Sequence, residues 1–151
     1  MEEQEYKHTY QTVNKRRCVY EKAINSRRCN CTKCHRFNLA DREGVACKSA
    51  TGNALCTEFL NTLRSKARFS LGLTHSDKPL PHAKEIRVQT GGLLGLQELL
   101  DPDKAGSPHA SNIIGLLDAA IERYEHLNSL PYNIIVQSVV KFEGRKKRQR
   151  S

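Results

Sequence analysis

The stretch SPHASNIIGLLDAAIERYEHL, residues 107–127, decides the fold class. Its apolar side chains recur every three or four positions, at Ile113, Leu116, Leu117, Ala120, Tyr124 and Leu127. That spacing predicts an amphipathic helix with one face on a core. Ser107 and Pro108 are typical of an N-cap and a first helical position, so we expect the helix to start there.

Helical spacing also dominates the rest of the chain. It predicts further helices over residues 6–25, from about 49–53 to 69, 83–100 and 131–142. Gly91 and Gly92 weaken the helix over 83–100, so a strand over 85–90 followed by a helix over 93–100 is the alternative. The β-branched residues within 131–142 keep a strand possible there.

The chain has 151 residues, of which 38% are hydrophobic, and this fits one ordinary domain. We predict a mainly α fold, a small single domain of four or five helices over residues 1–144, with a basic tail at 145–151. Its Cys-rich basic half is residues 1–70, and its Leu-rich helical body is residues 83–142. A Cys-rich loop over 27–50 joins the first two helices.

No apolar run approaches the roughly 18–20 residues that a membrane helix needs. The N-terminal residues are acidic and then basic, without the apolar stretch of a secretory signal. We therefore expect no membrane span and a cytoplasmic location.

The positive charge is concentrated in the first half and the tail. Lys and Arg number 25 against 16 Asp and Glu, a formal net charge of +9. Residues 15–36 hold eight basic side chains and one acid, Glu21, which is typical of contact with a phosphate backbone. The candidate nucleic-acid contacts are Arg16, Arg17, Arg27, Arg28, Lys33, Arg36, Lys146 and Lys147. A solvated face that offsets the charge of a metal site is the alternative.

All six cysteines lie in the first half, and in a reducing compartment clustered thiols bind metal more often than they form disulfides. Cys18 and Cys29 would stand roughly 16 Å apart on one unbroken helix, so sharing a metal requires a break between them. Likewise, Cys47 must precede the helix that carries Cys56. We predict a metal site made of Cys18, Cys29, Cys47 and Cys56, with Cys31 and Cys34 as alternates.

Thiolates spread irregularly over separate segments suit an iron–sulfur cluster, which is our first expectation. Zinc is the alternative, because soft thiolate ligands bind both. The cysteines could instead be small buried hydrophobes, or Cys31 and Cys34 could form a reversible redox pair.

No catalytic motif such as GxSxG, HExxH or a P-loop is present, so we do not predict an enzyme. We predict a cytosolic metal-binding protein with a regulatory or accessory role, contacting nucleic acid through the basic residues near the cysteines. The alternative is a protein-interaction or assembly factor that docks a partner on its helical body.

Overall fold

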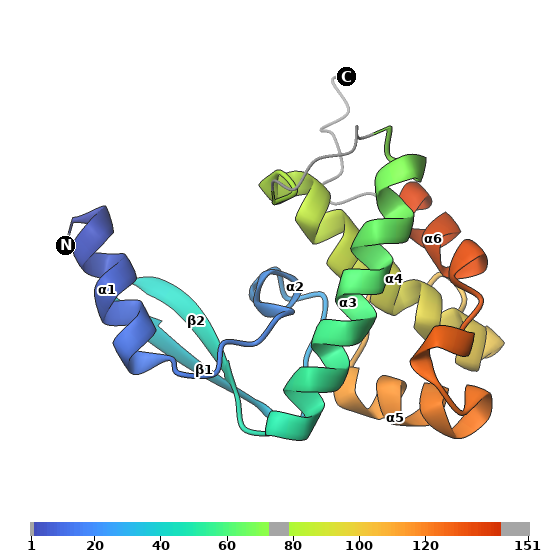
Figure 1. Cartoon of the computed structure of the whole chain (residues 1–151), viewed down its shortest axis with the longest axis horizontal. Helices are drawn as coiled ribbons and strands as arrows, with labels where there is room; N and C mark the ends of the chain where they lie inside the picture. Colours follow the sequence, from blue (N-terminus) through green and yellow to red (C-terminus); the bar gives the residue numbers. More distant parts are fainter. Residues whose placement is uncertain (1, 73–78, 143–151) are drawn as a thin grey trace, which may run out of the picture.

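The computed structural model describes residues 2–72 and 79–142, so Lys146, Lys147 and the predicted basic tail lie outside the described residues. The described chain is mainly helical with one two-stranded sheet (Figure 1). In chain order the elements are α1 (Glu3–Val13), α2 (Glu21–Asn25), β1 (Cys34–Leu39), β2 (Arg42–Cys47), α3 (Ala50–Ser70), α4 (His82–Leu100), α5 (Ile113–Tyr124) and α6 (Tyr132–Lys141), with short 3-10 turns at Pro102–Lys104 and Leu127–Ser129. The predicted mainly α class is confirmed, with six α-helices in the described part where four or five were expected.

The helical body is built around α4, which packs against α3, α5 and α6, while α1 and the hairpin lie on the other side of α3 (Figure 1). One apolar core includes residues from both halves of the chain. Its fully buried side chains include Tyr20, Ile24, Val45, Phe59, Leu60, Leu93, Leu96, Ile113, Leu117 and Ile135.

The two neighbouring glycines of α4 bring the helices together and do not break α4. A Cβ atom on Gly91 would lie 2.8 Å from the Cα atom of Val139 in α6. One on Gly92 would lie 2.5 Å from a methyl group of Leu63 in α3. The single helix predicted over 83–100 is therefore confirmed, and the alternative strand over 85–90 is wrong.

The start of α5 depends on long-range backbone hydrogen bonds that its local sequence does not reveal. The predicted start of α5 at Ser107 is wrong, because α5 begins at Ile113. The backbone just before α5 is hydrogen-bonded to a distant segment. The N–H of Ala110 donates to the carbonyl of Arg28 (3.0 Å), and the carbonyl of Ala110 accepts from the backbone N–H of Asn30 (3.0 Å). The helix predicted after Pro131 is confirmed as α6, and the strand alternative there is wrong.

The single helix predicted over residues 6–25 is also wrong. It is divided into α1 and α2, because the backbone between them pairs with β2. The N–H of Cys18 donates to the carbonyl of Val45 (2.9 Å), and the N–H of Cys47 donates to the carbonyl of Arg16 (2.8 Å). The break between Cys18 and Cys29 that metal sharing required is also present, because α2 ends at Asn25.

The loop predicted over residues 27–50 is wrong in its second half, which forms the antiparallel hairpin β1–β2. Its register pairs Cys34 with Cys47 and Leu39 with Arg42. The two turn residues, Ala40 and Asp41, have φ values of 50° and 66°. A two-residue turn with positive φ at both positions matches the right-handed twist of the strands, but Asn-Gly is its usual sequence signal.

Within residues 2–72 and 79–142, no helix combines the length and the apolar character that crossing a membrane requires.

Candidate functional site

The pairing register puts three cysteines on one face of the sheet. Cys34 lies opposite Cys47, and Arg17 lies opposite Ala46 in an isolated bridge. Side chains alternate along a strand, and directly opposite residues share a face. Cys18 follows Arg17 just as Cys47 follows Ala46, so Cys18, Cys34 and Cys47 all project from the same side.

These three thiols meet two others around one small cavity, called here the thiol cavity. Cys31 comes from the loop before β1, and Cys56 comes from the second turn of α3. Its free volume is about 20 Å³, close to the volume needed for one water molecule. Its remaining walls are Val19, Tyr20, Lys33, Gly52, Asn53, Ile113 and Ile114.

Burial keeps two of these thiols protonated when no metal is bound. It raises the pKa of Cys18 to about 12, and the nearby Cys47, Cys31 and Cys34 thiols contribute to the increase. It also raises the pKa of Cys56 to about 12, with contributions from Cys18, Cys31 and Cys47. The five thiols are thus close enough to repel one another as thiolates, and a cation among them would relieve that repulsion.

The remaining thiols have local hydrogen-bond partners. The backbone N–H of Lys33 donates to the sulfur of Cys31 (3.5 Å). The Cys47 thiol donates to the carbonyl of Ser49 (3.1 Å), and the Cys34 thiol donates to Oδ1 of Asn30 (3.3 Å). Within the described part of the chain, no three His, Cys, Asp or Glu side chains already stand in a metal-holding arrangement. Binding an ion would therefore require several of the five thiols to move closer together.

The surroundings of the cavity favour negative charge at its centre. Gly52 and Asn53, in the first turn of α3, form part of its wall. The N-terminal end of a helix carries partial positive charge, which stabilises nearby thiolates. Ser49 caps this helix, accepting from the N–H of Gly52 (2.9 Å), and the exposed Lys33 adds a positive charge at the rim.

The hydroxyl of Tyr20 lacks a protein partner within the described residues. Tyr20 is fully buried and lines the thiol cavity, yet its oxygen makes no hydrogen bond there. Burial raises the pKa of this hydroxyl well above its ordinary value, and Cys56, Cys29 and Cys18 add to that increase. A buried donor without an acceptor costs free energy, and metal-bound sulfur next to it would supply one.

Cys29, a predicted ligand, lies apart from the thiol cavity. It is buried, its backbone forms an isolated parallel bridge with Ala110, and it is not among the cavity's wall residues. Burial raises its pKa to about 12, while a backbone bond with Ala110 and the charge of Arg28 act in the opposite direction. The structure thus gathers Cys18, Cys47 and Cys56 with both alternates, Cys31 and Cys34, and leaves Cys29 outside.

The predicted nucleic-acid contacts are divided among several environments. Arg17 binds Glu21, and Arg27 binds Glu43. Arg36 donates to the carbonyl of Ile24 (3.2 Å). Arg28 lies over the ring of Phe142, 5.5 Å from its centre.

Arg16 and Lys33 remain exposed beside the thiol cavity, and two lysines join them that the predicted set omitted. The backbone N–H of Lys48 donates to the carbonyl of Lys33 (2.8 Å), so these two residues are neighbours. Lys15 precedes Arg16 and is also exposed. We call Lys15, Arg16, Lys33 and Lys48 the hairpin-base cations. Lys48 directly follows β2, and the hairpin places it next to Lys33. The sequence did not predict this hairpin, because its turn at Ala40 and Asp41 lacks the usual Asn-Gly signal, and Lys48 was therefore not identified.

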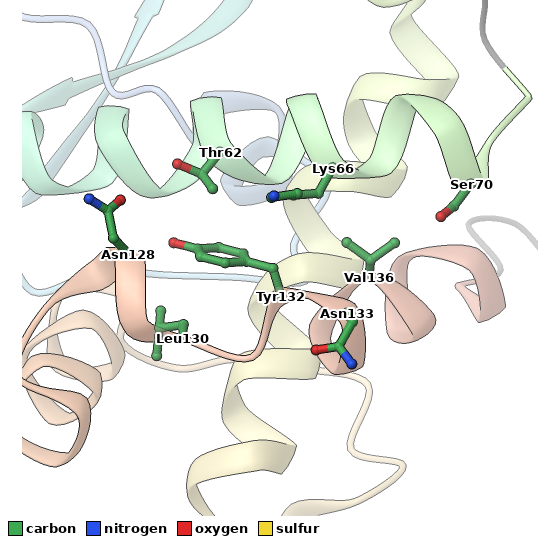
Figure 2. A pocket seen from close by; sticks show the side chains of 8 residues that line it. All are labelled: Thr62, Lys66, Ser70, Asn128, Leu130, Tyr132, Asn133 and Val136. Atoms are coloured by element: carbon green, nitrogen blue, oxygen red, sulfur yellow. The ribbon is translucent and has the colours of Figure 1, made fainter.

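A separate pocket of about 650 Å³ lies between α3 and the C-terminal part of the chain (Figure 2). Figure 2 shows Thr62, Lys66 and Ser70 on α3 facing Tyr132 and Val136 of α6. The Tyr132 hydroxyl donates to the carbonyl of Leu127 (2.7 Å), so it has a structural partner. Among the described residues that line this pocket, none is Cys, His, Asp or Glu.

The sequence matches no known protein family, and searches of curated proteins and of solved structures find no significant match.

Proposed function

We propose that this chain is a metal-binding protein in which four of the five thiolates around the thiol cavity hold one metal centre. The observation that carries the proposal is the convergence of five thiols, from separate segments of the chain, on one small pocket. Cys29 is left out of the proposed ligand set, and the alternates Cys31 and Cys34 enter it.

The size of the cavity favours a single zinc ion over an iron–sulfur cluster. The free space is about 20 Å³, which suits one ion among sulfur atoms. Four thiolates in tetrahedral geometry are a common structural zinc site. A four-iron cluster is larger and would have to push the walls of the cavity apart.

The metal would act as a structural clamp. The five thiols belong to the segment before α2, the β1–β2 hairpin with its preceding loop, and α3. An ion bound to thiolates from all three would tie the hairpin to the helical body. Since thiolates must lose their protons to bind, this stabilisation would be coupled to proton release.

We propose that the clamped hairpin contacts nucleic acid in a regulatory or accessory role. The support is the position of the hairpin-base cations, which are exposed next to the thiol cavity. Within the described residues, none of these four side chains forms an ion pair with a carboxylate. Exposed Lys and Arg of this kind bind phosphates and release counterions. A reducing cytoplasm, where thiols remain free for metal, fits this role.

The test is to purify the chain without oxygen and to count zinc, iron and sulfide in wild type and in two double variants. Cys29→Ser with Cys34→Ser leaves four cavity thiols, whereas Cys31→Ser with Cys34→Ser leaves three. We expect one zinc per chain in wild type and in the first variant, and loss of stoichiometric metal in the second. Equal metal in both variants, or none in wild type, would refute the site.

A second candidate function is supported by two exposed apolar side chains on α6, Ile134 and Val140, which are 48% and 41% exposed. They favour a protein-interaction or assembly role for the helical body. Ile134→Lys with Val140→Lys would abolish partner capture in that case. The same variant would leave metal content and nucleic-acid binding unchanged, and this separates the two functions.

A further inference from the structure

A broad groove with a basic lining lies beside the thiol cavity, between the N-terminal segments and the helical body. Its volume is about 980 Å³, at the upper end of the range for ligand sites. We call it the basic groove. It is lined by Lys7, Arg17, Cys18, Val19, Glu21, Lys22, Arg64, Arg68, Pro79, Leu80, Glu85 and Gln89.

In the groove, the acidic side chains are nearly buried and two of the arginine side chains are more exposed. Among the described residues of the lining, five side chains are basic and two, Glu21 and Glu85, are acidic. These two residues are 7% and 6% exposed, so their carboxylates are almost covered. The side chain of Arg17 is 61% exposed and that of Arg64 is 35% exposed. A ligand entering the groove therefore meets positive charge first.

The buried carboxylates hold these two arginines in place. Glu21 Oε1 accepts from Nε (2.9 Å) and Nη2 (2.6 Å) of Arg17. Glu85 Oε1 accepts from Nε of Arg64 (2.6 Å). A guanidinium has five N–H donors, so each arginine keeps donors for a ligand. Within the described chain, Nη1 of Arg17 makes no hydrogen bond. Arginines fixed in this way lose little conformational freedom when they bind a phosphate.

The lining also indicates what part of a ligand the groove would recognise. None of the twelve described residues that line it is aromatic, so they offer no platform for stacking bases. Arg and Lys donors suit phosphodiester oxygens instead. We propose that the basic groove binds the phosphate backbone of a nucleic-acid single strand, without reading its sequence. This rests on the proposed function, and it extends the nucleic-acid surface from the hairpin-base cations to the helical body.

The groove and the thiol cavity share a wall. Cys18 and Val19 line both spaces. A metal bound by Cys18 would thus fix one side of the groove, and its loss would loosen that side. We expect a strand to bind the metal-loaded protein more tightly than the metal-free protein.

The test measures binding of a short labelled single strand of mixed sequence to the metal-loaded full chain over a series of salt concentrations. The groove variant carries Lys7→Ala and Lys22→Ala, which leave the buried carboxylate pairs intact. The matched control, Lys104→Ala with Lys141→Ala, removes the same charge from exposed positions that do not line the groove. We expect the groove variant to bind roughly tenfold more weakly and to lower the salt slope by about 1.4. The control variant should lose much less binding affinity.

Three outcomes overturn or redirect this inference. If wild type binds and the groove variant behaves as the control does, the groove does not take the strand. If only Lys15→Ala with Lys48→Ala weakens binding, the hairpin-base cations act alone and the proposed function stands without the groove. If a mononucleotide competes as effectively as the strand, the groove binds a free nucleotide and the strand proposal is wrong. Failure of wild type to bind any nucleic acid contradicts the nucleic-acid part of the proposed function itself.

Discussion

Cys34 and Cys47 stand directly opposite each other on the two strands of the hairpin, and both line the thiol cavity. Opposite residues in an antiparallel pair have Cα atoms about 4.5–5.5 Å apart. Strand pairing alone therefore brings these two thiols together, while the segment before α2 and helix α3 supply Cys18 and Cys56. The thiol cavity is thus the place where the hairpin, that segment and the helical body meet.

The carboxylate of Glu21 is the centre of a second junction, between α1, α2 and β2. It accepts hydrogen bonds from the Tyr10 hydroxyl, from Arg17 and from the backbone N–H of Val45 (2.8 Å). Glu21→Gln removes the negative charge of the carboxylate and leaves these three donors facing a neutral amide. We expect the free energy of unfolding, measured by urea denaturation, to fall by about 3 kcal/mol.

The control is Glu43→Gln, which breaks an ion pair with Arg27 whose side chains are 41% and 60% exposed. Exposed pairs contribute little, so its loss should stay below about 1 kcal/mol. Equal losses for Glu21→Gln and Glu43→Gln would mean that the buried junction is not an anchor.

Removing the Tyr20 hydroxyl should have opposite effects on the two states of the protein. In the metal-free chain this buried hydroxyl has no hydrogen-bond partner among the described residues. Tyr20→Phe should therefore raise the free energy of unfolding by about 1 kcal/mol. If the hydroxyl donates to a metal-bound thiolate, the same change should weaken metal binding roughly tenfold.

Thermal unfolding of the metal-free protein and a competitive zinc titration measure the two effects. Tyr124→Phe, outside the cavity, serves as the control and should change neither. A Tyr20→Phe variant that binds zinc as wild type does would show that the hydroxyl does not touch the metal site.

The contact between α4 and α6 depends on the missing side chain of Gly91. A Cβ atom there would meet backbone, the Cα atom of Val139 at 2.8 Å. Gly91→Ala gains about 1 kcal/mol of helix propensity but forces the helices apart, which costs about 1–3 kcal/mol. We expect a net loss of stability in chemical denaturation.

Gly115→Ala in α5 is the matched control, because its Cβ atom would meet only the side chain of Asn112, at 2.8 Å. That amide is the end of a side chain, but its oxygen accepts hydrogen bonds from Thr32 (3.1 and 3.3 Å). Moving it should offset part of the propensity gain, so we expect little net change in stability. A stabilised Gly91→Ala variant would contradict the close helix contact.

The buried thiols predict how stability depends on pH. Burial raises the pKa of Cys29 from 9.0 to about 12. Between these values the folded chain keeps a proton that the unfolded chain has lost. The free energy of unfolding is therefore unaffected well below pH 9, falls as the pH rises through 9 to 12, and then levels off. The slope is at most about 1.4 kcal/mol per pH unit for each thiol.

Comparison with Cys29→Ala isolates this thiol, since the variant lacks the titrating group and should lose stability less steeply. Cys18 and Cys56 should behave in the same way only without metal, because metal-bound thiolates have already lost their protons. Identical alkaline slopes for wild type and Cys29→Ala would contradict the burial of a protonated thiol.

Apolar spacing predicted the helices α3, α4 and α6, because each buries one face in the core and its pattern is local. It failed where long-range backbone pairing overrides that pattern. Residues 16–18 continue a helical stripe but bond to β2, and Ala110 bonds to the segment at Arg28. The hairpin was missed because Ala40 and Asp41 adopt positive φ without a glycine.

This long-range backbone pairing, which the sequence does not reveal, also limited the prediction of the site. Spacing along helices excluded some cysteine combinations, and it required a break between Cys18 and Cys29, where α2 ends at Asn25. It gave no reason to separate Cys29 from Cys31, because the pairing of Cys29 with Ala110 is a long-range contact that helical spacing does not reveal. The ligand identities themselves remain a prediction.

The most direct test of the account is a Co²⁺ titration of the reduced, metal-free chain, followed by visible spectroscopy, in wild type and in Cys29→Ser. Cobalt takes the place of zinc and reports its ligands through its colour. We expect one Co²⁺ per chain with the absorption of a tetrahedral four-thiolate site in both proteins, displaced by one zinc. A colourless titration of wild type, or loss of the site in Cys29→Ser, would contradict it.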